Sequence, residues 1–131
     1  MSGKNYLLDT NIVINLFANQ STVVERIRSQ SANFFIPSIV IGELFYGAYQ
    51  STRKDDNVRR VESFARASIV LDCDLLTARY YGQVKSALKS KGTPIPENDV
   101  WIAAIAYQYQ LTLVTRDKHF THVDTINIEN W

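Results

Sequence analysis

Four acidic residues of this sequence stand beside or within apolar stretches instead of in polar surroundings: Asp9, Glu43, Asp99 and Asp117. If folding brings them together, their carboxylates repel one another by up to about 4 kcal/mol per pair at ~4 Å in a protein-like dielectric. Such a cluster is stable only when protons are shared or a cation lies among the acids. Oxygen ligands favour Mg²⁺ or Mn²⁺, ions that also bind substrate phosphates. The four acids therefore predict a metal-assisted reaction on a phosphate ester.

Two of these acids are expected at one edge of a sheet. Asp9 ends the apolar run 6–8 and Asp117 follows the run 111–115, and we expect both runs to be strands. In open α/β sheets, ligands bind at the carboxyl edge of the strands. Each acid also has a structural alternative. Asp9 can cap the helix that follows it, and Asp117 can belong to a turn with its basic neighbours.

The other two acids are expected on helices entered from the same edge. Glu43 is the one charge in the apolar stretch 39–49, and Asp99 opens the stretch 100–109, which contains no charged residue and predicts a buried helix. The macrodipole alone favours an acid in the position of Asp99. Glu43 can form a buried pair with an arginine, because an unpaired buried charge is costly. These alternatives must all hold at once, so we favour one shared acidic pocket.

The histidines do not suggest a zinc site. His119 and His122 lack the H-E-x-x-H arrangement and have no set of partner cysteines, because Cys73 is the one cysteine of the sequence. We expect both histidines on the surface. A single cysteine also excludes an intramolecular disulfide, as is usual in a reducing compartment. The expected location is the cytoplasm.

Short apolar runs alternate with helical patterns along the chain. We predict strands at 6–8, 34–36, 69–71, 111–115 and, as a short edge strand, 125–128. We predict helices at 12–17, 23–29, 39–49, 75–90 and 100–109, and a solvated turn over 50–60 that enters a helix ending near 67. The expected N-caps are Ser21 or Thr22, Ser38 and Asp74. The alternation predicts one α/β domain, residues 1–131, with a mainly parallel sheet of four to five strands flanked by helices.

Composition limits the class of protein and of partner. With 46% hydrophobic and 21% charged residues, the chain is not a disordered one. No apolar stretch approaches the roughly 20 residues of a membrane span, and Asp9 and Asn11 interrupt the first apolar run, so we expect neither membrane association nor a signal peptide. The net charge of +1 means that attraction to nucleic acid must come from a local patch.

The densest basic segment is the candidate for such a patch. Its members with the strongest claim are Arg53, Lys54, Arg59 and Arg60. They form either a solvated helix face or a track for RNA phosphates.

Four segments, in order along the chain, resemble the motifs of one family: YLLDTN at 6–11, IGELFYGA at 41–48, NDVWIAA at 98–104 and TRDKHF at 115–120. They are similar to the motifs of PIN domains, and in particular of the VapC-like toxin ribonucleases of type II toxin–antitoxin systems. The four acids all lie within these segments, and the position of Asp117 varies between aspartate and asparagine in the family. The resemblance spans nearly the whole chain and implies a sheet flanked by helices.

The resemblance also implies an activity and partners. A PIN-domain toxin cleaves RNA endonucleolytically with Mg²⁺ or Mn²⁺, through attack of activated water on a phosphodiester. Such toxins form homodimers and are neutralised by a VapB-like antitoxin that occupies a groove and obstructs the site. The implied partners of this chain are therefore an RNA substrate, a cognate antitoxin and a second copy.

Each acid has an implied role within this resemblance. Asp9 and Asp99 would be the principal metal ligands. Glu43 would complete the pocket or orient the attacking water, and Asp117 would be a ligand or an outer acid. Neighbouring side chains would hold the carboxylates in place: Thr10, Asn11 and Thr115.

Two other functions fit parts of the pattern. The first is a phosphatase with Asp9 as nucleophile, as in haloacid-dehalogenase-like enzymes. Those enzymes carry a second acid two residues further on, where this chain has Asn11. The second is a non-catalytic binding module of the same fold. Such modules tend to lose the acids that this chain keeps.

Overall fold

The computed structural model describes residues 4–131, which form a three-layer α/β arrangement around a five-stranded sheet. All four strand pairings are parallel, and the strand order is β3-β2-β1-β4-β5. The strands are β1 (Asn5–Leu8), β2 (Asn33–Pro37), β3 (Ile69–Leu71), β4 (Thr112–Val114) and β5 (Asn127–Glu129). The predicted parallel α/β fold is confirmed, including the short fifth strand at an edge.

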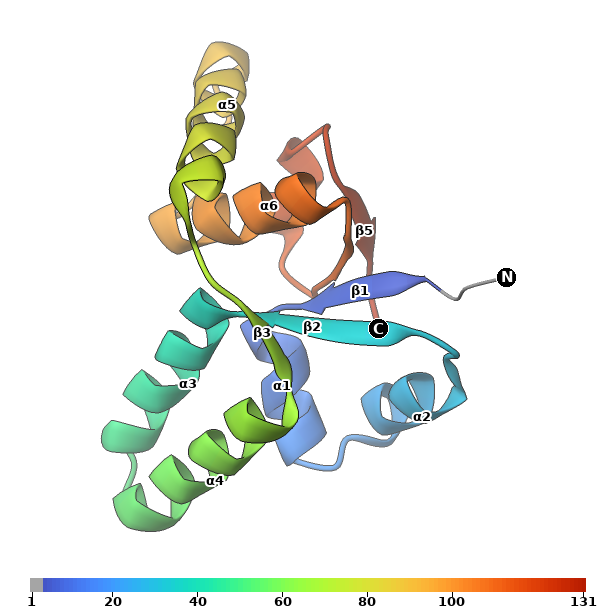
Figure 1. Cartoon of the computed structure of the whole chain (residues 1–131), viewed down its shortest axis with the longest axis vertical. Coiled ribbons are helices and arrows are strands. Elements are labelled where there is room, and N and C mark those ends of the chain that lie inside the picture. Colours follow the sequence, from blue (N-terminus) through green and yellow to red (C-terminus); the bar gives the residue numbers. More distant parts are fainter. Residues whose placement is uncertain (1–3) are drawn as a thin grey trace.

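Helices cover both faces of the sheet. Figure 1 shows α1 to α4 on one side of the sheet and α5 and α6 on the other. The helices are α1 (Thr10–Phe17), α2 (Ser21–Ser29), α3 (Ser38–Tyr49), α4 (Lys54–Ala67), α5 (Leu75–Lys91) and α6 (Glu97–Tyr109), with a short 3₁₀ helix η1 (Lys118–His122). None of the helices in 4–131 is both long and apolar enough to cross a membrane.

The core lies where α6 and the central strands meet. Leu7 of β1 pairs in register with Leu113 of β4, and both side chains are fully buried. Ile102 and Ile105 of α6 are buried as well, which confirms the prediction from its uncharged sequence. Because the strands are buried on both faces, they need near-continuous apolar runs rather than alternating ones.

Several predicted boundaries are wrong, for local reasons. The side chain of Gln20, not of Ser21 or Thr22, caps α2 by accepting a hydrogen bond from the Val23 amide at 3.0 Å. Pro37 is the N-cap residue of α3, so Ser38 is its first helical residue. The predicted cap at Asp74 is confirmed: its carboxylate accepts a bond from the Thr77 amide at 2.9 Å.

Apart from α5, the helices also begin earlier than predicted, and for α4 and α6 this changes which residues lie in the first turn. The expected turn is present over 50–53 but not over 54–60, because α4 begins at Lys54 and places Asp55 and Asp56 in its first turn, where the macrodipole favours acids. Helix α6 begins at Glu97, and its first turn therefore contains Asp99. Asp99 therefore lies at the N-terminal end of α6 and not before the helix.

Candidate active site

The carboxyl ends of β1 and β4 bring together residues from opposite ends of the sequence. The Asp9 amide donates to the carbonyl oxygen of Val114 at 3.0 Å, which extends the β1–β4 pairing to the ends of both strands. The next residue of each chain segment then turns away from the sheet, Thr10 into α1 and Thr115 toward η1. Both predicted strand-end acids, Asp9 and Asp117, thus lie near the same edge.

Asp9 is buried, with 4% of its surface exposed, and three donors hold its carboxylate. The Thr10 amide donates to Oδ1 at 2.8 Å, and the Thr115 hydroxyl donates to Oδ2 at 2.7 Å. The Asn11 amide group also donates to Oδ2, at 3.4 Å. The first of these bonds makes Asp9 the N-cap of α1. Asp9 therefore caps this helix and also lies among the acids.

The surroundings of Asp9 disfavour its charge. Burial raises the pKa of Asp9 above its ordinary value, and the bonds from Thr115 and Thr10 oppose that shift. The negative charges of Glu43 and Asp117 raise the pKa of Asp9 further. An acid that is repelled by two others in a buried position favours a nearby cation.

Glu43 reaches this region from α3 through a single contact. The Thr10 hydroxyl donates to Glu43 Oε1 at 2.7 Å. The alternative of a buried pair with an arginine is wrong, because Glu43 takes part in no ion pair within residues 4–131. A neutral hydroxyl orients the Glu43 carboxylate without cancelling its charge.

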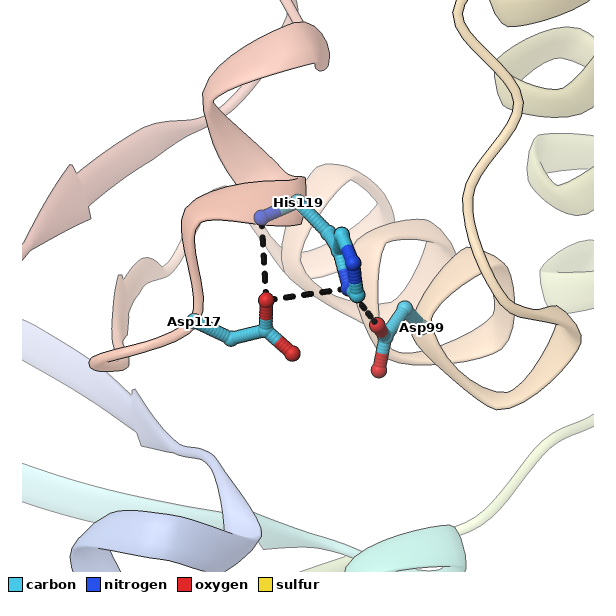
Figure 2. A group of neighbouring side chains, drawn as sticks. All are labelled: Asp99, Asp117 and His119. Atoms are coloured by element: carbon cyan, nitrogen blue, oxygen red, sulfur yellow. Dashed lines mark hydrogen bonds and ion pairs between the residues drawn. The ribbon is translucent and has the colours of Figure 1, made fainter.

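Within residues 4–131, Asp99, Asp117 and His119 form a group of potential metal ligands. Figure 2 shows the His119 imidazole between the two carboxylates. Nδ1 of His119 lies 3.2 Å from Asp99 Oδ2 and 2.9 Å from Asp117 Oδ1. One ligand atom from each residue lies within 4.8 Å of the other two. Two carboxylates and an imidazole are a donor set that can hold a divalent metal ion.

His119 is a site residue that the sequence interpretation missed. Its side chain is exposed, as expected, and it still contacts both Asp99 and Asp117. Asp117 is the N-cap of η1 and accepts the His119 amide at 2.9 Å, and this tight turn brings the His119 ring back over the Asp117 carboxylate. The spacing of an acid and a histidine two residues apart after a strand was the available signal.

The charge balance of the Asp99 carboxyl group is also unusual. Burial raises the pKa of Asp99 to about 6, and the hydrogen bond with His119 opposes that shift. The charges of Asp117 and Asp9 raise the pKa of Asp99 further. The three aspartates therefore interact electrostatically, and with Glu43 they occupy one region of the molecule.

Hydrogen bonds link the predicted supporting side chains to these acids. The Thr115 hydroxyl, which donates to Asp9, also accepts the Asp117 amide at 2.9 Å. The Asn11 side chain donates to Asp9 and accepts the Arg116 amide at 3.2 Å. Thr115 and Asn11 thus each connect the β1–α1 junction with the segment that follows β4.

Three of the four residues of the predicted basic track lie away from the acids. Arg53 and Arg59 both bind Asp56, at 3.0 Å and 2.7 Å. The Arg60 guanidinium lies 4.5 Å from the centre of the Phe17 ring and donates to the Phe17 carbonyl oxygen. Figure 1 shows the first turn of α4, which begins at Lys54, at the tip of the α3–α4 hairpin. Arg60 lines the same hollow as Glu43, whereas Arg53, Lys54 and Arg59 line a separate hollow at the start of α4.

Comparison with known proteins shows the family to which this fold and its motifs belong. The PIN domain family matches residues 6–126. The chain belongs to the PIN domain family. The VapC2 ribonuclease of Haemophilus influenzae is 34% identical to this PIN domain over 128 residues, 96% of this chain and 97% of the relative. The tRNA(fMet)-specific endonuclease VapC of Salmonella typhimurium is 35% identical over 128 residues, with the same coverage.

A solved structure is similar over nearly the full length. The DNA-bound VapBC of Salmonella typhimurium contains a chain that superposes on this PIN domain with a TM-score of 0.88 and 34% identity. The alignment covers 98% of both chains. The family suggested by the four sequence motifs is thus confirmed.

Proposed function

We propose that this PIN domain, formed by residues 1–131, is a divalent-metal-dependent endoribonuclease and the toxin of a VapBC-type pair. The observation that supports the activity best is the group of Asp99, Asp117 and His119 beside the buried, repelled carboxylate of Asp9. The names of the Haemophilus and Salmonella relatives, a ribonuclease and an endonuclease, support RNA as the substrate.

Within the proposed site, Asp9, Asp99 and Asp117 would hold the ion, and His119 would add a nitrogen ligand. When bound, the ion would supply activation of water and stabilisation of charge on the phosphodiester. The Thr10 hydroxyl holds Oε1 of Glu43, and Oε2 would orient water and accept its proton. Thr10, Asn11 and Thr115 keep the carboxylates of Asp9 and Glu43 in fixed orientations, so no reorganisation is needed when RNA binds.

The ion is Mg²⁺ or Mn²⁺ in this proposal. The three aspartates are hard oxygen ligands that suit both ions. The His119 nitrogen favours Mn²⁺ of the two, because imidazole is a better ligand for transition metals than for Mg²⁺. Titration of each ion into the metal-free protein by calorimetry measures this preference.

The partners in this proposal are a VapB-like antitoxin and a second copy of the chain, in the cytoplasm. The VapBC assembly of the Salmonella relative supports the antitoxin. A hollow of about 240 Å³ between α1, α3 and α4 lies beside Glu43 and is lined mainly by apolar residues, among them Ile14, Phe17, Leu44 and Val61. Such a surface suits an apolar segment of a protein partner.

The phosphatase alternative is disfavoured by the residue two positions after Asp9. Haloacid-dehalogenase-like enzymes carry a second acid two residues after the nucleophile, whereas this chain has Asn11 there, and the Asn11 side chain donates a hydrogen bond to Asp9 Oδ2. The non-catalytic alternative is disfavoured by the complete set of four acids.

The decisive experiment is mapping of RNA 5′ ends after brief expression of the protein, with Asp99→Asn as the control. New ends that appear with the wild-type chain and not with the variant would support the proposal and identify the substrate. The same purified proteins, incubated with that RNA in EDTA or in Mn²⁺, test the metal dependence. Cleavage by Asp99→Asn at the wild-type rate would overturn the assignment.

A further inference from the structure

Arg116 stands directly beside the acidic pocket, between Thr115 and Asp117. An arginine in this position of a nuclease invites assignment as a contact for the substrate phosphate. The contacts of its side chain point to a different task. We propose that Arg116 is a positioning residue, which fixes Asp9 through Asn11 and does not bind RNA. This inference rests on the proposed ribonuclease function.

The Arg116 guanidinium is already bound within the protein. Nε donates to the main-chain oxygen of Trp131 at 2.5 Å, and Nη2 donates to Gln20 Oε1 at 3.4 Å. Hydrogen bonds from a charged donor are among the stronger ones in proteins. A phosphate contact through the Nε–Nη2 edge would require Arg116 to give up both acceptors, which leaves only its other N–H groups for one.

Both acceptors are themselves firmly held. Trp131 is 5% exposed and packs edge-on against Tyr6 and Phe34, with ring centres 5.1 Å and 6.0 Å away. Gln20 caps α2 through the Val23 amide. The guanidinium is therefore anchored to the end of the sheet and to the start of a helix, two parts that do not belong to the pocket.

The backbone of the same residue faces the pocket. The Arg116 amide donates to Asn11 Oδ1 at 3.2 Å, and the Asn11 amide group in turn donates to Asp9 Oδ2. Because Asn11 has one carbonyl and one amide group, fixing its oxygen also fixes which way its donor points. The anchored side chain of Arg116 thus determines the orientation of Asn11 and, through it, of Asp9.

A matched control is present in the structure. The Arg26 guanidinium lies 5.3 Å from the centre of the same Trp131 ring and pairs with Glu129 at 3.8 Å. Among its contacts in the described chain, none reaches segment 115–117. Arg26→Met and Arg116→Met both remove an arginine from Trp131, and only Arg116→Met releases the backbone that faces Asn11.

The first measurement does not depend on activity. Hydrogen exchange of the residue 116 amide, followed by NMR on the metal-free full chain, should accelerate at least about tenfold in Arg116→Met and stay unchanged in Arg26→Met. Equal exchange in wild type and Arg116→Met would overturn the proposed anchor. This outcome is independent of whether the protein cleaves RNA.

The second measurement uses the RNA identified by end mapping. Loss of outer hydrogen-bond partners of a metal site typically lowers activity 10- to 100-fold. We expect a fall of that size in kcat for Arg116→Met with KM unchanged, partial recovery in Arg116→Lys, and wild-type kinetics for Arg26→Met. If wild type fails to cleave any RNA, the proposed function fails while the exchange result on Arg116 stands.

The third measurement separates positioning from phosphate binding and from general stability. In an Asp99→Asn background, the slope of log affinity against log salt for the same RNA should be equal with Arg116 and with Met. A slope reduced by about 0.7 would identify a lost phosphate contact and overturn the proposal. In active protein, the double variant Asn11→Ala/Arg116→Met should lose no more kcat than the less active of the two single variants. A loss equal to the product of the two single losses would mean that the residues act independently, and would overturn the proposal.

Discussion

The hydroxyl of Thr115 donates to Asp9 Oδ2 at 2.7 Å across a separation of 106 residues in the sequence, and the bond is buried. The same oxygen accepts the Asp117 amide. One hydroxyl group therefore orients two acids of the pocket, one through its proton and the other through its lone pair. Substitution of Thr115 should therefore disturb both Asp9 and Asp117.

Thr115→Val keeps the shape of the side chain and removes both hydrogen bonds. We expect the free energy of unfolding to fall by about 1–2 kcal/mol, because a buried acceptor and a donor lose their partner. We expect metal affinity to fall 10- to 100-fold. Urea unfolding and calorimetric titration with Mn²⁺ measure the two effects. Thr115→Ser retains the hydroxyl and should stay near wild type; a Ser variant as weak as Val would contradict this role.

Stability of the metal-free protein should depend on pH through Asp99. Its pKa in the folded protein is raised to about 6, from an ordinary value of 3.8, chiefly by burial. Between these values the folded state binds more protons than the unfolded one, so the free energy of unfolding falls as pH rises from about 4 to about 6. With allowance for partial solvent screening, we expect a loss of about 2 kcal/mol.

The comparison with Asp99→Asn isolates this effect, because other groups titrate in the same range. Urea unfolding in EDTA near pH 4 and near pH 7 should show the variant gaining on wild type at the higher pH. Mn²⁺ added near pH 7 should raise the Tm of wild type and leave that of Asp99→Asn nearly unchanged. Parallel pH profiles for the two proteins would contradict the assigned role of Asp99.

His119 should tune the choice of ion. His119→Asp converts the site to oxygen ligands alone, and we expect the ratio of Mn²⁺ to Mg²⁺ affinity to fall about tenfold. His119→Ala should weaken Mn²⁺ binding more than Mg²⁺ binding. Calorimetry on the protein without RNA measures both ratios, and His122→Ala, at the far end of η1, is the control. Identical ratios in wild type and His119→Asp would exclude His119 as a ligand.

The predicted basic track remains testable through Asp56. This acid holds Arg53 and Arg59, so Asp56→Asn releases two guanidinium groups at the tip of the α3–α4 hairpin. If this segment binds RNA phosphates, the variant in an Asp99→Asn background should bind RNA more tightly and with a steeper salt dependence. Asp124→Asn, which releases Lys91, removes the same charge elsewhere. Equal effects of the two variants would indicate a gain from net charge alone.

Parallel strands and acids were readable from the sequence because both leave local signals. A buried strand such as β1 needs three consecutive apolar residues, and Asp9 and Asp117 had to follow strands that end at one edge. The contacts among side chains left no such signal. The His119 ring lies between two acids because Asp117 begins a 3₁₀ turn. Gln20 caps α2 in place of the expected Ser21 or Thr22, because its side chain extends forward to the Val23 amide.

Segment 53–60 illustrates the same limit for charges. Its arginines are visible in the sequence, but whether Arg53 and Arg59 face RNA or Asp56 depends on where α4 starts. In the helix that begins at Lys54, Asp56 and Arg59 are three residues apart and lie on one face. Arg53, at the N-cap position, reaches the same Asp56. A turn over 50–60 would have left them separate.

The strand order has a consequence for synthesis of the chain. Strand β1 is made first, whereas its neighbour β4 and the acid Asp117 come more than 100 residues later. Asp9 can pair with Thr115 only after β4 has joined the sheet beside β1. An incomplete chain still attached to the ribosome contains Asp9 and Glu43 but lacks the other half of the pocket. The acidic pocket is therefore incomplete until the segment 112–119 has been translated and has joined the sheet beside β1.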